Sequence, residues 1–259
     1  MQPLSVVIIT FNEARNIERA IKSVINISDD IIIVDSYSTD ETKSICQKFN
    51  VTFIQRKWEG YSQQKNFANS LAKHSYILSL DADESLDNKL ENEIQNLKKN
   101  GFKGVYVLNR LVNYCGQWIK HSTWYPDKKI RIFPKDTSQW SGQLVHEELE
   151  IDQSLEVIEL SGHLHHFTYY NYIEHRERAD KYSNLTAIKM HQAGKKASIF
   201  KPYLSAFVRF ISMFVIHLGF LDGFKGFKIA QISAYSNIYK YKRLRQLNSE
   251  NKGGEKNSN

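Results

Sequence analysis

The sequence predicts an α/β domain built on a mostly parallel sheet with helices on both faces. Two observations lead to this expectation. Continuous apolar, β-branched runs such as "LSVVIIT" and "DIIIVDS" are typical of strands that are buried on both faces. Between these runs, apolar residues recur with helical spacing. Strands that alternate with helices in this way indicate a parallel sheet.

The elements follow one another through the first 110 residues. Strands are expected at 4–10, 30–36, 51–55, 75–80 and 103–110. A helix is expected at 12–27, because Ile17, Ala20, Ile21 and Val24 recur at i, i+3, i+4 and i+7. Three more are expected: one from a Ser38/Glu41 capping box to about Phe49, one at 61–73, and one at 88–100 between an Asp87 cap and Gly101.

Beyond about residue 110 the periodicity weakens, and we expect loops, short strands and one helix near 171–190. A later apolar stripe is interrupted by Arg209 and His217, so its apolar run is shorter than the roughly 20 residues that a membrane-spanning helix needs. We therefore expect a helix that lies in the membrane interface. A buried packing helix is the alternative. The stripe consists of Phe207, Phe210, Ile211, Phe214, Val215 and Leu218. The final basic stretch is expected to be disordered at its end.

The bulk composition bounds the partners and the compartment. A net charge of +7 and a pI near 9.2 favour an anionic partner: nucleic acid, an anionic membrane or a phosphorylated substrate. No helix-turn-helix or RNP pattern occurs, so we expect no nucleic acid. Cys46 and Cys115 lack metal-site spacing and fit a reducing cytosol. The first residues lack the pattern of a signal peptide, so a cytoplasmic location is expected.

Polar side chains follow the ends of the four predicted N-terminal strands, where parallel sheets bind ligands. These side chains are Thr10, Asn12, Glu13, Asp35, Gln55, Arg56, Asp81 and Asp83. No G-x-G-x-x-G turn or G-x-x-x-x-G-K loop is present to bind phosphates. Asp81 and Asp83 could instead hold Mg²⁺ or Mn²⁺, which would bridge a diphosphate. A set of solvated loops is the alternative.

Four motifs carry a family resemblance. "SVVIITFNE", "IIIVDSYSTDET", "QQKNFA" and "ILSLDADE" resemble successive motifs of the family 2 glycosyltransferases, which implies a GT-A type, nucleotide-diphospho-sugar transferase fold. Further motifs, "WYPDKKIRIFPKD", "WSGQLVHEEL", "LHHFTYYNYIEH" and "GFLDGFKGF", are similar to the bacterial lipopolysaccharide core glucosyltransferase subgroup. The resemblance implies a nucleotide-sugar-binding half at 1–110 and an acceptor and base half at 111–195. An amphipathic helical segment at 196–238 and a basic polar tail at 239–259 follow.

The resemblance also implies residue roles. Thr10, Asn12 and Glu13 would line the nucleotide pocket, and Asp35 would meet the uracil or ribose. The other implied contacts are Lys65 and Asn66 on the nucleotide side, Asp81 near the ribose and diphosphate, Asp83 on the metal, and Arg131 at the phosphates or the acceptor.

The general base would be Glu147 or Glu148, and we favour Glu147 because its His-Glu pair matches the subgroup. Ordinary strand-edge charges are the alternative. His166 would complete the metal shell or contact the diphosphate, or else simply pack. A zinc site formed by His163, His165 and His166 is not favoured, since no Cys or H-E-x-x-H helix accompanies them.

The expected function is inverting, metal-dependent transfer of a hexose, in the first instance glucose from UDP-glucose. The expected acceptor is a cell-envelope glycolipid such as a lipopolysaccharide core, at the inner face of the cytoplasmic membrane. The alternative is a nucleotide-sugar-binding protein without catalysis. Donor sugar, acceptor, linkage and oligomeric state stay open at this stage.

Overall fold

A computed structural model describes residues 1–142 and 147–256, and the side chains up to residue 250. The chain forms two compact units. Unit 1 comprises Met1–Leu111 and Asp127–Phe167, and unit 2 comprises Val112–Pro126 and Thr168–Asn259. This division differs from the expected one, because the region 111–195 is shared between the units. The helix near 171–190 therefore belongs with the C-terminal helices.

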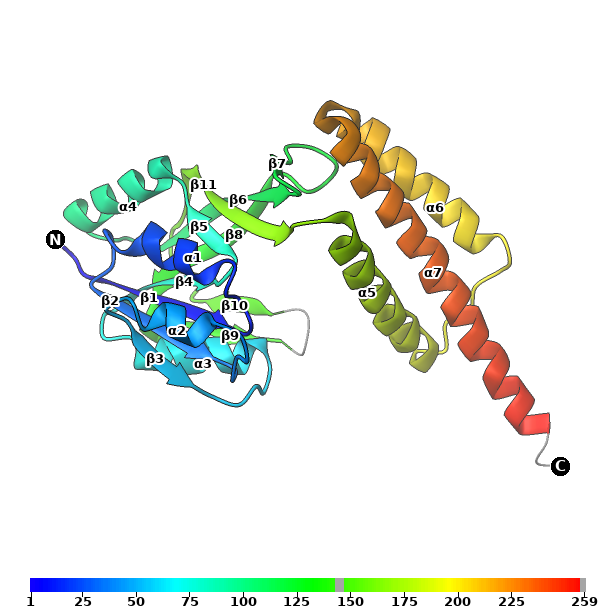
Figure 1. The fold of residues 1–259 in the computed structure, drawn as a ribbon, viewed down its shortest axis with the longest axis horizontal. Coiled ribbons are helices and arrows are strands. Elements are labelled where there is room, and N and C mark those ends of the chain that lie inside the picture. Colours follow the sequence, from blue (N-terminus) through cyan, green and yellow to red (C-terminus); the bar gives the residue numbers. More distant parts are fainter. Residues whose placement is uncertain (143–146, 257–259) are drawn as a thin grey trace. The chain divides into compact units, whose positions relative to one another are not determined.

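Unit 1 is organised by a sheet whose first strands are parallel (Figure 1). Strands β1 (Leu4–Thr10), β2 (Asp30–Asp35), β3 (Thr52–Gln55) and β4 (Tyr76–Asp81) pair in the order β3-β2-β1-β4, all parallel. All residues of β1 and β2 are buried. Their unbroken apolar sequence is explained by this burial on both faces, and the predicted α/β class is confirmed.

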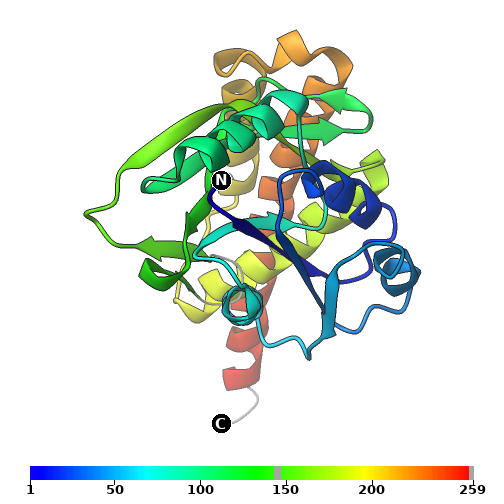
Figure 2. The same ribbon diagram turned by 90° about the vertical axis from the view of Figure 1, so that its left-hand side faces the viewer.

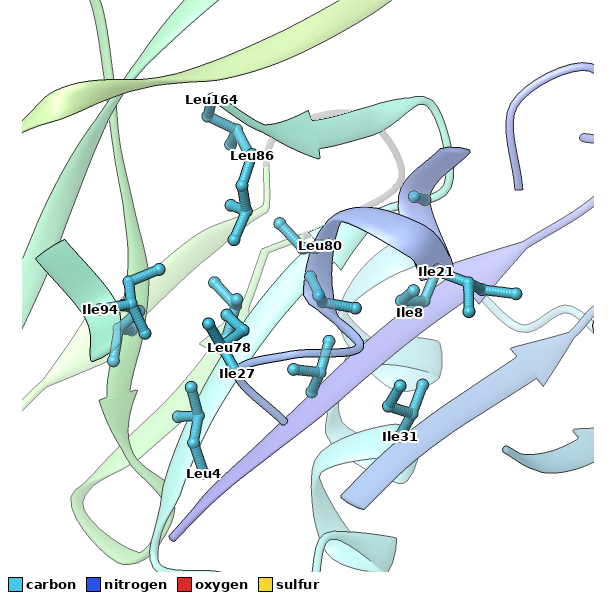
Figure 3. Close-up of a cluster of buried hydrophobic side chains, with 14 of the residues drawn as sticks. Leu4, Ile8, Ile21, Ile27, Ile31, Leu78, Leu80, Leu86, Ile94 and Leu164 are labelled. Carbon is cyan, nitrogen blue, oxygen red and sulfur yellow. The ribbon is translucent and has the colours of Figure 1, made fainter. Parts of the chain in front are cut away.

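Helices cover both faces of these strands. Helices α1 (Ile17–Val24), α2 (Thr42–Cys46) and α4 (Asn88–Asn100) pack into one apolar cluster, whereas α3 (Tyr61–Leu71) packs into another. Figures 1 and 2 show α1 and α4 on the side of the sheet opposite α3. In Figure 3, Leu4 and Ile8 of β1 and Leu78 of β4 lie among side chains from α1 and α4. The alternation along β1 therefore divides its side chains between the two clusters.

Antiparallel strands extend the sheet beyond β4. Strand β8 (Asp127–Pro134) pairs with β4 and with β6 (Val105–Tyr114), and β11 (Val157–Tyr169) pairs with β5 (Glu84–Leu86). The order continues β4-β8-β6-β11-β5, and β9 (Ser138–Ser141) forms a separate pair with β10 (Glu148–Ile151). Neither β5 nor the length of β11 was predicted, because both strands lack the continuous apolar pattern that marks β1 and β2.

One predicted capping interaction is wrong and one is confirmed. The Ser38/Glu41 capping box does not form: α2 begins after Glu41 without a side-chain cap, and the Ser38 hydroxyl instead accepts from the Asn12 N–H at 2.8 Å. Asp87 does cap α4, since its carboxylate accepts from the Leu90 N–H at 2.7 Å. Gly101 ends that helix at a φ of 86°, which glycine adopts without steric penalty.

Unit 2 contains the short strand β7 (Gln117–Trp118) and three helices, α5 (Tyr172–Gln192), α6 (Lys201–Ile211) and α7 (Gly223–Lys256). Helix α7 packs against both α5 and α6. The core of unit 2 is aromatic. The hydroxyl of Tyr114 lies 2.8 Å from Nδ1 of His175, and the rings of Trp124 and Tyr169 lie edge-on to the ring of Tyr114. The carboxylate of Asp222 accepts from the backbone N–H groups of Lys120 and His121.

One expectation for the C-terminal region is corrected. The apolar segment near 203–221 is not one helix: α6 ends at Ile211, a π turn follows over Ser212–Ile216, and the chain bends at Leu218, which has a φ of 55°. Most of the basic tail is helical, as far as Lys256, and Leu244 is fully buried, so packing overrides the polar composition there. Residues 257–259, at the end where disorder was expected, lie outside the described residues. In the described residues no single helix is long and apolar enough to cross a membrane. By length and composition alone, the bent pair Lys201–Ile216 and Gly219–Glu250 could do so within the described part of the chain.

Candidate active site

The carboxyl ends of the parallel strands bring the predicted polar residues to one edge of unit 1. Thr10 pairs with Asp35, Asp35 pairs with Gln55, and Asp81 pairs with the residue before Thr10. The register therefore places the last residues of β1, β2, β3 and β4 next to one another. The convergence expected from the strand order is confirmed.

Asp81 is held between two cations. Its Oδ1 lies 3.1 Å from Nζ of Lys65, and its Oδ2 lies 2.7 Å from the guanidinium of Arg131. Burial alone would raise the pKa of this carboxyl, but Arg131 and then Lys65 hold it well below its usual value. Asp81 is therefore ionised across the physiological range, with both oxygens engaged by the protein.

Asp83 is held by a histidine from a distant part of the chain. Pairing of β5 with β11 sets His166 opposite Glu84, and Nε2 of His166 lies 3.1 Å from Oδ2 of Asp83. Burial tends to raise the pKa of Asp83, whereas His166 lowers it below its usual value. The structure thus joins two of the three predicted metal ligands.

This pair offers a carboxylate and an imidazole to a divalent cation that is shared with a phosphate. In residues 1–142 and 147–256, no group of three or more His, Cys, Asp or Glu side chains could hold a metal ion by itself. Mg²⁺ commonly takes one or two protein ligands and completes its shell with substrate phosphates and water. Asp83 fits that pattern, whereas the imidazole nitrogen of His166 suits Mn²⁺ better than Mg²⁺. The metal role of Asp81 stays a prediction.

Glu147 lies at the same edge. Oε1 of Glu147 is 3.3 Å from Nζ of Lys65, the ammonium that also contacts Asp81. The side chain of Lys65 is 2% exposed and its ammonium lies 4.5 Å from the ring centroid of Trp140. Glu148 begins β10 and is exposed. His146, the other half of the motif on which the choice of Glu147 was based, lies outside the described residues.

Glu84 is a site residue for which the sequence suggested no role. Its side chain is fully buried, and Oε1 lies 2.6 Å from Arg131 and 3.4 Å from Arg110. Its Oε2 accepts from the backbone N–H of Asp81 at 3.0 Å. Arg110 in turn contacts Asp127 at 2.6 Å. Arginines inside two apolar strand sequences, "VLNRLV" and "KIRIF", were the available signal, since such cations need a buried carboxylate.

The loop after β1 is organised by hydrogen bonds with the loop after β2. The Asn12 side-chain oxygen accepts from the Thr39 N–H at 2.8 Å, and Glu13 accepts from the side chain of Asn16 at 2.7 Å. The Oγ1 of Thr10 is buried with no hydrogen-bond partner in the described residues. An unsatisfied buried hydroxyl is costly, so Thr10 is the residue of this loop whose environment most favours a ligand contact.

Two other predicted nucleotide contacts already have protein partners. Asp35 is fully buried, and its carboxylate accepts from Gln55 at 3.1 Å and from Ser38. The amide of Asn66 donates to the carbonyl of Trp140 at 2.7 Å and accepts from its N–H at 2.9 Å. These contacts fix α3 against β9, which positions Lys65. The nucleotide roles of Asp35 and Asn66 stay predictions, as does a phosphate contact by Arg131, which is 3% exposed.

Comparisons with known proteins identify the family of the chain. The family described as Glycosyl transferase family 2 matches residues 5–182. An uncharacterized glycosyltransferase of Rickettsia typhi is 30% identical over 257 residues, covering 95% of this chain and 88% of the relative. The lipopolysaccharide core biosynthesis glycosyltransferase LpsC of Rhizobium meliloti is 26% identical, covering 90% and 88%. A crystal structure of S. aureus TarS aligns with a TM-score of 0.46 at 14% identity, covering 98% and 92%.

The parallel core with its acidic carboxyl edge and the family match together define a glycosyltransferase with a GT-A type fold. The chain belongs to glycosyl transferase family 2, whose matching region begins on β1 and ends within α5. The resemblance noted from the sequence motifs is thereby confirmed.

Proposed function

We propose that this glycosyltransferase moves a hexose from a UDP-sugar, with glucose as the first candidate, onto a hydroxyl of a cell-envelope glycolipid such as a lipopolysaccharide core, with inversion. The observation that carries this proposal is the contact of Glu147 with Lys65, which also contacts Asp81. It joins a candidate base to the acidic edge of the sheet. The likeness to LpsC over nine-tenths of the chain supports the choice of acceptor.

The proposed chemistry is a single in-line displacement. The acceptor oxygen forms a bond to the anomeric carbon while the bond from that carbon to the phosphate oxygen breaks. The acceptor proton passes to the Glu147 carboxylate, and the nucleoside diphosphate leaves with the bonding electron pair. General-base help of this kind is worth roughly 10²–10⁴-fold in rate.

Lys65 serves as the positioning residue in this scheme. Its ammonium is buried away from solvating water, so its positive charge is stabilised by the carboxylates of Asp81 and Glu147 instead. Its contact with the Trp140 ring further restricts where it can lie. Lys65 thereby keeps Glu147 beside the strand end on which the donor is expected to bind.

Asp83 and His166 would hold a divalent cation shared with the donor diphosphate. Such a cation neutralises the negative charge that develops on the departing diphosphate. The protein's own contribution is to hold both donors in register through the pairing of β5 with β11 and the bond from the Phe167 N–H to the Asp83 carbonyl at 2.9 Å.

A donor screen tests the proposal. UDP-, GDP- and dTDP-sugars are incubated with the protein and Mn²⁺, and release of nucleoside diphosphate is followed with and without a truncated lipopolysaccharide acceptor. We expect release with a UDP-hexose that the acceptor accelerates. Binding of the nucleotide-sugar without any turnover would instead support the alternative function, a binding protein that lacks catalysis.

Matched variants identify the base. We expect Glu147→Gln to slow transfer by about 10²–10⁴-fold, in line with the loss of a general base. Glu148→Gln removes a neighbouring exposed carboxylate and should leave transfer within about twofold, since surface changes away from a site have small effects. The opposite ranking would assign the base to Glu148.

A further inference from the structure

Unit 2 exposes a dense set of large apolar side chains along α6, the turns that follow it and the start of α7. We call this set the apolar surface: its members are Phe200 (78% exposed), Leu204 (62%), Phe207 (65%), Ile216 (68%), Leu221 (57%) and Phe224 (64%). Phe200, Leu204 and Phe207 are spaced three or four residues apart, so they follow one face of α6. Several large apolar side chains exposed along one helix and the turns that follow it mark an interaction site.

The apolar surface is additional to the residues that hold the helices together. The inward positions are filled by Ala206 and Met213, which are buried, and by Phe210 and Phe214, whose rings pack around Phe227 at 5.8 and 5.9 Å. Helix α6 therefore carries apolar residues on two sides, only one of which is covered by unit 2. A helix that is apolar on more than one side needs a second apolar environment.

The surroundings of the apolar surface are basic. Nζ of Lys228 lies 5.4 Å from the ring centroid of Phe224, and Nζ of Lys242 lies 5.5 Å from that of Tyr203. Between Ala193 and Ser249 the sequence holds a single carboxylate, Asp222. That carboxylate is buried and bonded to backbone N–H groups, so it does not offset the charge at the surface.

Further cations gather on the same helices. Burial lowers the pKa of Lys240 on α7, and the nearby charges of Arg209 and Lys201, both exposed on α6, lower it further. Like charges that are close enough to repel one another are stabilised by an anionic partner. The required partner must therefore combine an apolar phase with negative charge at its boundary.

We propose that the apolar surface lies in the interface of an anionic lipid bilayer, with Lys228 and Lys242 at the level of the headgroups. Amphipathic helices bind in this way, through apolar side chains at the acyl boundary and Lys or Arg at the phosphates. A second copy of the chain fits less well, because a two-fold contact would bring identical cations together.

Sedimentation with vesicles tests this assignment on the full chain. We expect binding to vesicles of phosphatidylethanolamine and phosphatidylglycerol, weakening as salt is raised, and much weaker binding to phosphatidylcholine alone. Replacing Phe200, Phe207 and Phe224 together by Ser should lower partitioning by about 100-fold, since each apolar anchor contributes on the order of a fivefold gain. The control replaces Ile25 and Val157, exposed apolar residues of unit 1, by Ser and should bind like the unmodified protein.

A charge variant gives an independent result if the triple variant folds poorly. Lys228→Gln combined with Lys242→Gln should weaken binding to the anionic vesicles by about tenfold and reduce its salt dependence. Equal binding by the triple variant and the unmodified protein would overturn the assignment. The assignment would also be overturned if the unmodified protein were a dimer that the triple substitution dissociates without changing vesicle binding. Vesicle binding is measured without substrates, so its failure is distinguishable from failure of the proposed reaction.

Discussion

Glu84 provides the most direct test of how unit 1 holds its acidic edge. The change Glu84→Gln keeps the shape of the side chain but removes its charge. The guanidinium of Arg131, whose side chain is 4% exposed, then keeps one carboxylate partner instead of two, at 2.7 Å on Asp81. Arg110 loses its 3.4 Å contact and keeps Asp127, which is partly exposed.

The magnitude follows from the burial of these partners. Removing one member of a buried ion pair costs about 3–5 kcal/mol, and the surviving bond from Arg131 to Asp81 places Glu84→Gln at the lower end, about 3 kcal/mol. For a unit of this size, that free energy corresponds to a fall of about 6–12 °C in Tm. Urea unfolding followed by tryptophan fluorescence and a thermal scan measure both quantities.

A matched control separates burial from the mere loss of a charge. Glu159 pairs with Lys128 at 2.7 Å, but both side chains are about half exposed, at 48% and 51%. Exposed pairs contribute roughly 0–1 kcal/mol, so Glu159→Gln should leave the urea midpoint almost unchanged. The reasoning fails if the two variants lose the same stability, or if Glu84→Gln loses less than about 1 kcal/mol.

The remaining predictions concern the cation, the pH dependence and a thiol. Asp83→Asn should abolish the dependence of donor turnover on Mn²⁺ and lower turnover by at least about 100-fold; full activity in this variant would exclude the Asp83 metal assignment. Burial lowers the pKa of His175 to about 4, below the value of about 6.5 in the unfolded chain, so protonation of His175 opposes folding. The free energy of unfolding should be highest above about pH 6.5 and fall by about 2 kcal/mol between pH 7 and pH 4.5. Urea unfolding of His175→Gln should lack this loss. Burial raises the pKa of the Cys46 thiol to about 12, so iodoacetamide at pH 8 should modify Cys46 only after denaturation, as mass spectrometry of the labelled peptides would show.

The elements of the parallel core could be predicted because their signals are local. The apolar runs of β1 and β2 and the spacing of Ile17, Ala20, Ile21 and Val24 reflect burial of whole elements, and all of these residues are buried. Asp87 was predicted as a cap for the same reason, since its partner is three residues away. Ser38 was not predicted correctly, because its hydroxyl is taken by a loop 26 residues earlier in the chain.

The candidate site likewise contains features that local sequence signals predict and contacts between distant residues that they do not. That Asp81 and Asp83 lie on the carboxyl edge follows from strand order alone. The contacts of Asp81 with Arg131, of Asp83 with His166 and of Lys65 with Glu147 join residues 50 to 83 positions apart. Strands β8 and β11 bring together the first two pairs, and the packing of α3 against β9 positions Lys65 for the third. These long-range contacts leave no local pattern in the sequence. Glu84 was missed because its partners Arg110 and Arg131 come from β6 and β8, 26 and 47 positions further along the chain.

The path of the chain between the units has a consequence for how the protein can be altered. Unit 1 gives way to unit 2 at Leu111, directly after Arg110, and again at Phe167, directly after His166. The chain returns to unit 1 at Asp127, the residue that pairs with Arg110. Every covalent junction between the units therefore adjoins a side chain of the ion-pair network or the candidate metal site. A deletion, graft or fusion made at these natural boundaries would disturb the chemistry before it disturbed either core.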